Sequence, residues 1–400
     1  MKGNQPDYVL LVVTLILIVL GILILSSVSA PLSQQKFGNT YYFLNHQLLF
    51  GLLPGIILGF LAFRMRLDSL KKWAPLLLLI NLVLVAMVFL PKIGTSFGGA
   101  ARWLDFGPIS FQPSEFLKLT SILYFAAWLA NRTSRKKPST RAKPRTRAKL
   151  GSGLSRTELR SSSGLGGRQT EKGFSQTFVA FLIVIGLISL LLIFQPDIST
   201  LGIIVLVAAL MYFLAETPLW HSILFVLLGA GGLLTLIKLA PYRAARLLVF
   251  LKPEIDPMGI GYQIKQALIA IGSGGISGLG LGMSQQRLGF LPHSISDSIF
   301  AILAEETGFI GCLILIFLFL TFFWRGFTVV KVSQNKFSQI AALGITSWIT
   351  LQALINIGSM IGVLPLTGIP LPFVSYGGSA LVSELIGVGI LLNISKHTSR

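Results

Sequence analysis

The stretch LGFLPHSISDSIFAILAEETGFIG, residues 288–311, continues without a break into CLILIFLFLTFFW, residues 312–324. The second part is an uninterrupted apolar run, which predicts a helix that crosses a membrane. The first part places Asp297 at the mouth of this span and Glu305 and Glu306 further in. Because a carboxylate at membrane depth costs roughly 2.5–3.5 kcal/mol on insertion scales, each of these acids is a candidate for function.

Apolar runs recur along the whole chain, which has 400 residues, 53% of them hydrophobic and only 12% charged. This composition excludes an ordinary soluble domain, since about 20 apolar residues suffice to cross the hydrocarbon core. We therefore expect an all-α polytopic membrane protein with about ten transmembrane helices, the first being a retained helix and not a cleaved signal peptide. The predicted spans are residues 8–29, 45–63, 73–91, 110–130, 174–194, 198–215, 219–240, 298–324, 337–364 and 379–395.

Basic residues predict the orientation of these spans. They cluster after the even-numbered spans, and the positive-inside rule then places those loops and both termini in the cytoplasm. A large extracytoplasmic loop, residues 241–297, is expected between spans seven and eight. The basic residues outside the longest loop are Arg64, Arg66, Lys71 and Lys72 after span two, Arg325, Lys331 and Lys336 after span eight, and Lys396 and Arg400 after span ten.

The net charge of +19 is concentrated in residues 132–172, which hold thirteen lysines and arginines against Glu158 and Glu171. This stretch is interrupted by Ser, Gly and Pro and has almost no apolar residues, which predicts a disordered cytoplasmic loop. It divides the chain into residues 1–131, the basic loop 132–173, and residues 174–400. Anionic lipid headgroups are its expected partner, with RNA as a weaker alternative.

The single cysteine, Cys312, lies inside an apolar run, and the four histidines are scattered. Neither pattern predicts a disulfide or a metal site.

The segments expected outside the membrane hold most of the Gly and Pro residues, with polar residues at the helix mouths. Irregular backbone at membrane depth is tolerated where it is packed in protein or lines a wet cavity, so we expect Asp297 to open onto an extracytoplasmic cavity. A structural role as helix N-cap or first-turn acid is the alternative. Glu305 and Glu306 point away from Asp297 and are expected to pair with groups on neighbouring helices, which argues against a two-carboxylate glycosidase site.

Further candidates lie on the same side. Glu115 and Lys118 share one face of span four and form either a self-neutralising ion pair or a lysine that faces an anionic ligand. Arg102 suits a phosphate, and Trp103 suits a sugar or a lipid headgroup.

Two more charged candidates remain open. Asp197, in the turn QPD, is either a structural cap or a second acid in the cavity. Lys265 lies in the amphipathic start of residues 261–286, a segment interpreted as interfacial or re-entrant, and either contacts a ligand or reaches lipid headgroups.

Six motifs occur in order along the chain: GGAARWLDFG, FQPSEFLKL, FQPDISTLG, GYQIKQALIAIGSGG, LP…SDSIFAILAEETGFIG and PLTGIPLPFVSYGGS. Together they resemble the SEDS family of bacterial shape, elongation, division and sporulation proteins, over residues 8–395 without the basic stretch. The segment GLGLGMSQQRLGFLP is more similar to the division and sporulation branch than to the elongation branch.

The resemblance implies a peptidoglycan glycosyltransferase that polymerises lipid II on the outer face of the bacterial plasma membrane, at the division septum. It implies a class B penicillin-binding protein and other division proteins as partners, with undecaprenyl diphosphate as leaving group and no nucleic acid. Carried over by motif, the essential acid is Asp297, and Glu115, Lys118, Asp197 and Ser375 are substrate-site positions. The family often has a glutamate after LP and a His-Thr pair before the acid, where this chain has His293, Ile295 and Ser296.

The expected mechanism makes Asp297 the general base that takes the proton of the 4-hydroxyl of an incoming lipid II. Lys118, Arg102 or a divalent cation (Mg²⁺ or Mn²⁺) would balance the charge on the departing diphosphate. A lipid II flippase and a non-catalytic division scaffold are the two rival classes.

Overall fold

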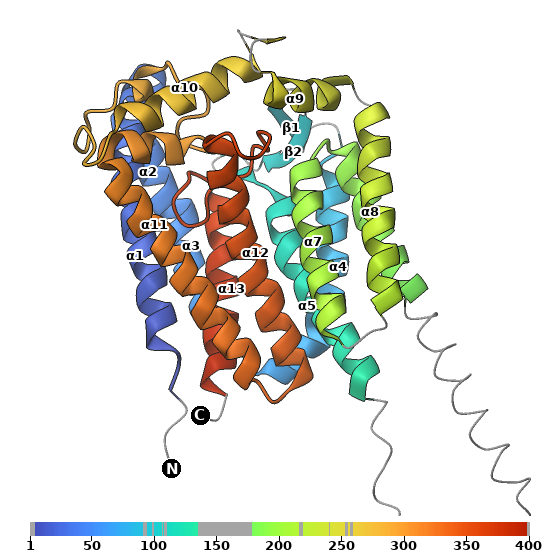
Figure 1. Cartoon of the computed structure of the whole chain (residues 1–400). Helices are drawn as coiled ribbons and strands as arrows, with labels where there is room; N and C mark the ends of the chain where they lie inside the picture. The colour runs from blue at the N-terminus through green and yellow to red at the C-terminus, as the bar shows by residue number, and fades with distance from the viewer. Residues whose placement is uncertain are drawn as a thin grey trace, which may run out of the picture.

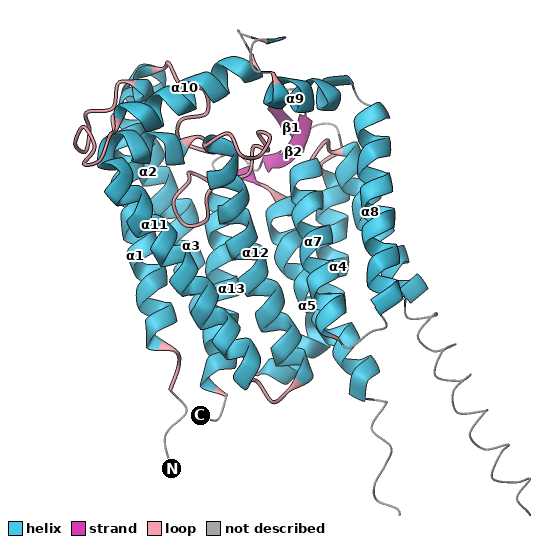
Figure 2. Ribbon diagram, viewed as in Figure 1, coloured by secondary structure: helices cyan, strands magenta, loops and turns pink. Residues whose placement is uncertain are grey.

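The computed structural model describes residues 5–90, 94–97, 100–105, 107, 110–134, 178–215, 219–239, 241–252, 255–256 and 259–397. These residues form a bundle of long helices with a small sheet and two crosswise helices at one end (Figures 1 and 2). The predicted basic loop lies mostly outside the described residues. Its first residues, 132–134, are helical and belong to the end of span four.

Each of the ten predicted spans coincides with one helix or one continuous helical unit. Six of these are long and apolar enough to cross a membrane: α1 (Tyr8–Phe37), the unit Tyr42–Arg64, α4 (Leu67–Met87), α11 (Ile299–Val332), α12 (Lys336–Met360) and α13 (Gly378–Lys396). The unit Tyr42–Arg64 consists of α2 (Tyr42–Gln47), the π-helix η1 (Leu48–Leu52) and α3 (Leu53–Arg64). The other four are α5 (Pro113–Ser134), the helix Phe178–Phe194, α7 (Ile198–Leu214) and α8 (Leu219–Leu239). That all ten cross the bilayer stays a prediction.

Both chain ends lie at the same end of the bundle, together with the α3–α4 and α11–α12 connections (Figure 1). Arg325 near the end of α11 grips Asp7 at the start of α1 with two guanidinium nitrogens, at 3.0 Å from Nε and 2.5 Å from Nη2 to Oδ2. The backbone N–H of Asp7 donates to Ser395 of α13 over 3.0 Å. This arrangement agrees with the even number of spans, whereas the cytoplasmic side itself stays a prediction.

The opposite end of the bundle carries the irregular segments. A three-stranded antiparallel sheet, in the order β1-β2-β3, consists of β1 (Gly94–Phe97), β2 (Ala100–Asp105) and β3 (Ser110–Phe111). The helical class is confirmed, but this small sheet was not predicted, because strands this short have too few residues to show a two-residue alternation. The predicted loop 241–297 contains α9 (Pro241–Leu251), α10 (Ile260–Ser273) and the 3-10 turn Gln286–Leu288, and α9 and α10 lie across the bundle end (Figure 1).

Helices α12 and α13 form the centre of the bundle. In α13, 89% of the residues in the most apolar window are buried, against 28% in α4. After Lys72 every exposed side chain of α4 is apolar, including Trp73, Leu76, Leu79, Ile80 and Val83. An exposed apolar face such as that of α4 is suited to contact with lipid. The central helices, which carry polar side chains, are enclosed by protein.

Helix α11 is broken at Gly308, where φ is +66° and ψ is −167°. The carbonyls of Glu305 and Glu306 accept hydrogen bonds from the N–H groups of Leu279 and Gly280, both at 3.0 Å. In return, the N–H groups of Phe309 and Ile310 donate to the carbonyls of Gly275 and Ile276, at 2.9 and 3.2 Å. The Gly-rich segment 274–280 therefore replaces two helical hydrogen bonds that the break removes.

The side chains of Glu305 and Glu306 bind neighbouring parts of the chain outside residues 274–280. The Glu305 carboxylate accepts from the hydroxyl of Ser284 and from the backbone N–H of Gln285, the latter at 3.1 Å. The Glu306 carboxylate accepts from Ser27 of α1 over 2.6 Å. The prediction that both pair with neighbouring helices is confirmed for Glu306 and wrong for Glu305, whose partners lie in the loop.

Candidate functional site

Asp297 lies at the bundle end that carries α10 and the sheet, immediately before the cap of α11, and its side chain is 9% exposed. Its Oδ1 accepts from the hydroxyl of Ser296 at 3.0 Å, and its Oδ2 lies 3.4 Å from Nε2 of Gln263 on α10. The N-cap residue of α11 is Ser298, and no side chain caps this helix. The N-cap alternative for Asp297 is therefore wrong, and its carboxylate is held by two neutral donors.

Three segments enclose this carboxylate. The amide of Gln263 also donates to the hydroxyl of Ser298 at 3.0 Å, which fixes α10 over the mouth of α11. Gly368 belongs to the α12–α13 connection, and a Cβ added to it would lie 4.0 Å from Oδ2 of Asp297. A larger side chain at position 368 would thus enter the space in front of the acid.

The backbone of Asp297 is fixed by Asn356 of α12. The Asn356 amide nitrogen donates to the Asp297 carbonyl at 2.8 Å and to the Ile369 carbonyl at 2.7 Å. Asn356 is fully buried. One carboxamide therefore joins the acid to the α12–α13 connection.

Ser375 makes a second link between the same segments. Its hydroxyl accepts from the N–H of Leu371 at 2.8 Å and donates to the carbonyl of Ser296 at 2.5 Å. The N–H of Tyr376 donates to the carbonyl of Ile295 at 2.8 Å. The structure places Ser375 against Ser296, the residue before Asp297, and its hydroxyl positions that residue, while its predicted role in substrate binding stays a prediction.

The predicted pair on α5 lies deeper in the bundle. Nζ of Lys118 is 2.8 Å from Oε2 of Glu115 and 2.8 Å from Oε1 of Gln352 on α12. It also lies 5.4 Å from the ring centre of Trp348, and Lys118 is only 2% exposed. The self-neutralising ion pair is thus present, and a ligand could reach this lysine only if the surrounding side chains moved.

Gln352 extends this cluster to a third charged residue. Its amide nitrogen lies 3.2 Å from Oε1 of Glu384 on α13, and Oε2 of Glu384 accepts from the N–H of Phe373 at 2.9 Å. The indole of Trp348 donates to Gln352 at 2.9 Å. Glu115 and Glu384 therefore share one lysine, directly and through an amide.

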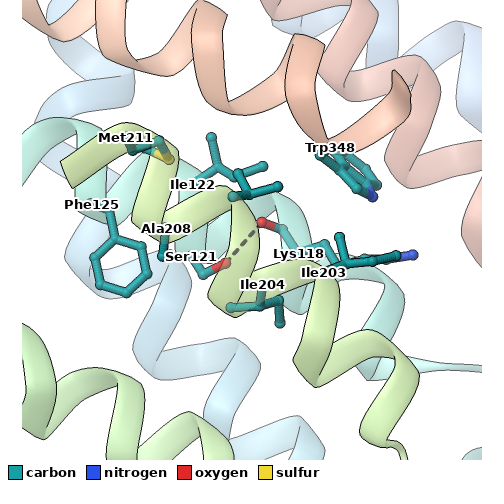
Figure 3. Close-up of a pocket in the computed structure, with 10 residues that line it drawn as sticks. Lys118, Ser121, Ile122, Phe125, Ile203, Ile204, Ala208, Met211 and Trp348 are labelled. Atoms are coloured by element: carbon teal, nitrogen blue, oxygen red, sulfur yellow. Dashed lines mark hydrogen bonds between the residues drawn. The ribbon is translucent and has the colours of Figure 1, made fainter. Parts of the chain in front are cut away.

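The stem of Lys118 borders a small apolar pocket between α5, α7 and α12 (Figure 3). The hydroxyl of Ser121 on the same helix donates to the carbonyl of Lys118 at 2.9 Å. On the side of this pocket, Lys118 is therefore surrounded by apolar side chains, which offer its ammonium group no anionic partner. The other labelled lining residues are Ile122, Phe125, Ile203, Ile204, Ala208, Met211 and Trp348.

Helix α12 connects the two clusters. Gln352 and Asn356 are four residues apart, hence on one face of the helix. Gln352 donates to the carbonyl of Pro370 at 3.1 Å, and Asn356 donates to the carbonyl of the preceding residue, Ile369. A shift of the α12–α13 connection would therefore alter the surroundings of Asp297 and of Lys118 together.

Arg102 and Asp197 form a separate cluster between the sheet and α7. The Arg102 guanidinium donates to the carbonyls of Gln195, at 3.3 Å, and Pro196. Asp197 caps α7 by accepting from the N–H of Thr200 at 3.3 Å and also accepts from Ser114 of α5 at 3.0 Å. The cap alternative for Asp197 is confirmed, and the described hydrogen bonds of Arg102 are used to hold the QPD turn.

The two remaining candidates differ in exposure. Trp103 on β2 is half-buried beside Arg102. Lys265 is exposed on α10, two residues after Gln263, so it points to a different side of the helix from the residue that contacts Asp297. No hydrogen bond or ion pair engages Lys265 within the described residues.

Four site residues escaped the sequence analysis: Gln263, Gln352, Asn356 and Glu384. Three of them lie inside predicted spans nine and ten, where amides and acids are costly and mark function or packing. That signal would have found them. For Gln263 the sequence has no such signal, because polar residues are ordinary in an interfacial helix.

A metal site made by the protein alone is not formed by the part of the chain that the structure describes, since no three Asp, Glu, His or Cys side chains lie together there. Around Asp297, one carboxylate and neutral oxygens are available. Such a set suits Mg²⁺ only if phosphate groups and water supply most of the ligands.

Comparison with known proteins identifies the family and the fold. The family model described as "Cell cycle protein", which covers FtsW, RodA and SpoVE, matches residues 8–400. The chain belongs to this family. The SEDS resemblance is thereby confirmed, and this SEDS protein is a multi-pass membrane protein.

Curated relatives match over nearly the full length. Stage V sporulation protein E of Bacillus subtilis (strain 168) is 34% identical over 99% of both chains. The probable peptidoglycan glycosyltransferase FtsW of Coxiella burnetii (strain RSA 493 / Nine Mile phase I) is 35% identical, over 98% of this chain and 96% of its own length.

Solved structures show the same fold. A chain from the structure titled "Structural coordination of polymerization and crosslinking by a peptidoglycan synthase complex" matches with a TM-score of 0.70 at 23% identity, over 98% of this SEDS protein and 99% of that chain. The crystal structure of the rod shape determining protein RodA of Thermus thermophilus matches with a TM-score of 0.63 at 22% identity, over 99% and 98% of the two chains.

Proposed function

We propose that this SEDS protein is a peptidoglycan glycosyltransferase that polymerises lipid II into glycan strands at the outer face of the plasma membrane during cell division. The printed names of the full-length relatives support the activity. The observation in the structure that carries the proposal is the placement of Asp297. It is a nearly buried carboxylate at the end of the bundle where the irregular segments gather, fixed by three different segments of the chain.

Asp297 is proposed as the general base. The groups that donate to its side chain, Ser296 and Gln263, carry no charge, so neither forms an ion pair with the carboxylate. The 4-hydroxyl of an incoming lipid II would donate its proton to Asp297 as its oxygen attacks the sugar carbon that bears the diphosphate. The bond from that carbon to the diphosphate oxygen breaks, and undecaprenyl diphosphate leaves.

The departing diphosphate needs positive charge. Lys118 and Arg102 were predicted for this role, but both have their described hydrogen bonds within the protein, whereas Lys265 on α10 is exposed and has none within the described residues. A divalent cation remains a proposal. Asp297 and phosphate oxygens would hold it, and it would supply charge to the leaving group.

The proposed partner is a class B penicillin-binding protein, which would cross-link the strands that this chain makes. The fold it shares with a chain of the peptidoglycan synthase complex supports the pairing. Location at the septum, with both termini in the cytoplasm, and contact with other division proteins belong to the same proposal.

Purified full-length protein in lipid nanodiscs, incubated with labelled lipid II with and without its partner, tests the activity. The expected result is a ladder of glycan products resolved by length. Transport of lipid II across vesicle membranes without any ladder would favour the flippase, and neither product nor transport would favour the scaffold.

A further inference from the structure

A second pocket, which has a polar lining, lies at the other end of the bundle, beside the chain termini. It has a volume of about 360 Å³ and is bordered by the α3–α4 connection, the α11–α12 connection and the end of α13. This pocket is too large to be a packing defect, because a water molecule occupies about 30 Å³ of liquid and the pocket has room for several of them. The lining residues are Arg66, Leu67, Asp68, Ser333, Gln334, Asn335, Ser338, Ile394 and His397.

Two helices begin at this pocket. Leu67 and Asp68 are the first two residues of α4, and Ser338 is the third residue of α12. No side chain caps α4, so its leading N–H groups are left for another acceptor, whereas Asn335 caps α12. Two helix N-termini at one pocket favour negative charge.

Unused hydrogen-bond donors line the same space. Ser338 is 4% exposed, lines the pocket, and has no hydrogen bond to another described residue. The hydroxyl of Ser333 is also buried without a partner. Since buried polar groups are almost always paired, these two hydroxyls are available to donate to a bound acceptor.

Arg66 supplies a positive charge. It lines the pocket and, within the described residues, no hydrogen bond or ion pair engages its guanidinium. His397 lies at the rim with its Nδ1 2.9 Å from the carbonyl of Asn393. Asp68 is the one acid of the lining, and it could accept hydrogen bonds from hydroxyl groups beside a phosphate.

We propose that this pocket binds a phosphate group, presented either by an anionic lipid headgroup or by a free phosphate compound. An Arg fork, two hydroxyls and the uncapped N-terminus of α4 are groups that phosphate oxygens accept from in proteins. The site is far along the bundle axis from Asp297, so it is separate from the proposed glycosyltransferase site. It does not depend on that activity.

The test uses purified full-length protein and two probes. Inorganic phosphate is titrated at constant ionic strength against chloride, with thermal unfolding as readout. In parallel, nanodiscs of phosphatidylcholine with or without phosphatidylglycerol are prepared, and the lipid retained after extraction is counted by native mass spectrometry. Stabilisation by inorganic phosphate would identify the ligand as a free phosphate compound. Retention of phosphatidylglycerol, without stabilisation by inorganic phosphate, would identify it as a lipid headgroup.

Arg66→Gln should weaken the response to the effective probe about tenfold or more, because a charge-assisted contact is lost. Asp68→Asn should strengthen binding of inorganic phosphate. Arg64→Gln is the matched control, since Arg64 lies two residues away outside the lining and should leave the response unchanged. Ser338→Leu places a larger side chain in the pocket and should weaken binding. If that variant fails to fold, Arg66→Gln still tests the proposal.

The proposal is overturned if neither probe binds to the wild-type protein. It is equally overturned if Arg64→Gln and Arg66→Gln weaken binding to the same extent, because the effect would then be one of general surface charge.

Discussion

The side-chain amide of Asn356 donates to the backbone carbonyl of Asp297 across 2.8 Å, from a helix that begins at the opposite end of the bundle. The same nitrogen holds the carbonyl of Ile369. The position of the candidate base is thus set by a residue in the core of the protein. This relationship makes a distinction between positioning and chemistry testable.

Asp297→Asn should abolish glycan chain formation while the protein remains folded. Asparagine keeps the size of the side chain and one of its two acceptor oxygens but cannot take a proton, and loss of a general base typically lowers the rate by about 10²–10⁴. The readout is the product ladder from labelled lipid II. Asp105→Asn, an exposed acid at the same end, is the control and should keep full activity. Wild-type rates from Asp297→Asn would remove this residue from catalysis.

Asn356→Asp should lower both stability and activity. The change replaces a donor by an acceptor that faces two carbonyls, at a cost of about 1–3 kcal/mol. Asn393→Asp is a matched control, since Asn393 donates to the carbonyls of Ala62 and Met65 at the far end of the bundle. Both variants should unfold at lower temperature, but only Asn356→Asp should reduce the rate per folded molecule. Equal rates in the two variants would show that Asn356 has a structural role only.

Lys118→Met should destabilise the protein by about 3–5 kcal/mol, because Glu115 loses the partner of a buried ion pair. The double variant Glu115→Gln/Lys118→Met should recover much of that loss. If Lys118 also serves the diphosphate, the double variant will be stable and inactive. Thermal unfolding and the polymerisation rate, measured on the same samples, separate the two roles. Full activity in the double variant would confine Lys118 to packing.

Gly308→Ala should destabilise the protein, at roughly 1–3 kcal/mol for backbone strain alone, because φ is +66° there. An added Cβ would also lie 2.3 Å from the backbone nitrogen of Gly278. Hydrogen exchange at Leu279 and Gly280 should become faster as their acceptors move. Gly202→Ala in α7, where a Cβ meets nothing within 4 Å, should be neutral or stabilising. Similar unfolding temperatures for the two variants would mean that the break in α11 is not needed.

The orientation can be tested with cysteines in a Cys312→Ala background. A cysteine at Ser155, within the basic stretch, should react in intact cells only with a membrane-permeant maleimide. A cysteine at Ser110, exposed in β3, should react with an impermeant reagent as well. Impermeant labelling of position 155 would reverse the assignment of sides.

The amino-acid sequence by itself determined the helical bundle, the position of each predicted span and the family. Hydrophobic runs of span length can form only helices in lipid, so length and composition are enough. The motif around Asp297 was equally readable, since an acid at a helix mouth is rare in such runs. The spacing of Glu115 and Lys118 predicted their ion pair, because three residues place two side chains on one helical face.

Only the tertiary structure decided what surrounds these residues. Helical periodicity says which face a side chain occupies but not which helix it meets, so the partners Gln352, Asn356 and Glu384 came from packing. The two acids that raised the first question, Glu305 and Glu306, illustrate the limit. Their backbone carbonyls hold a Gly-rich segment at the Gly308 break, and that segment reaches them because positive-φ glycines let its backbone approach α11 closely. Such contacts join positions distant in sequence, and local pattern carries no information about them.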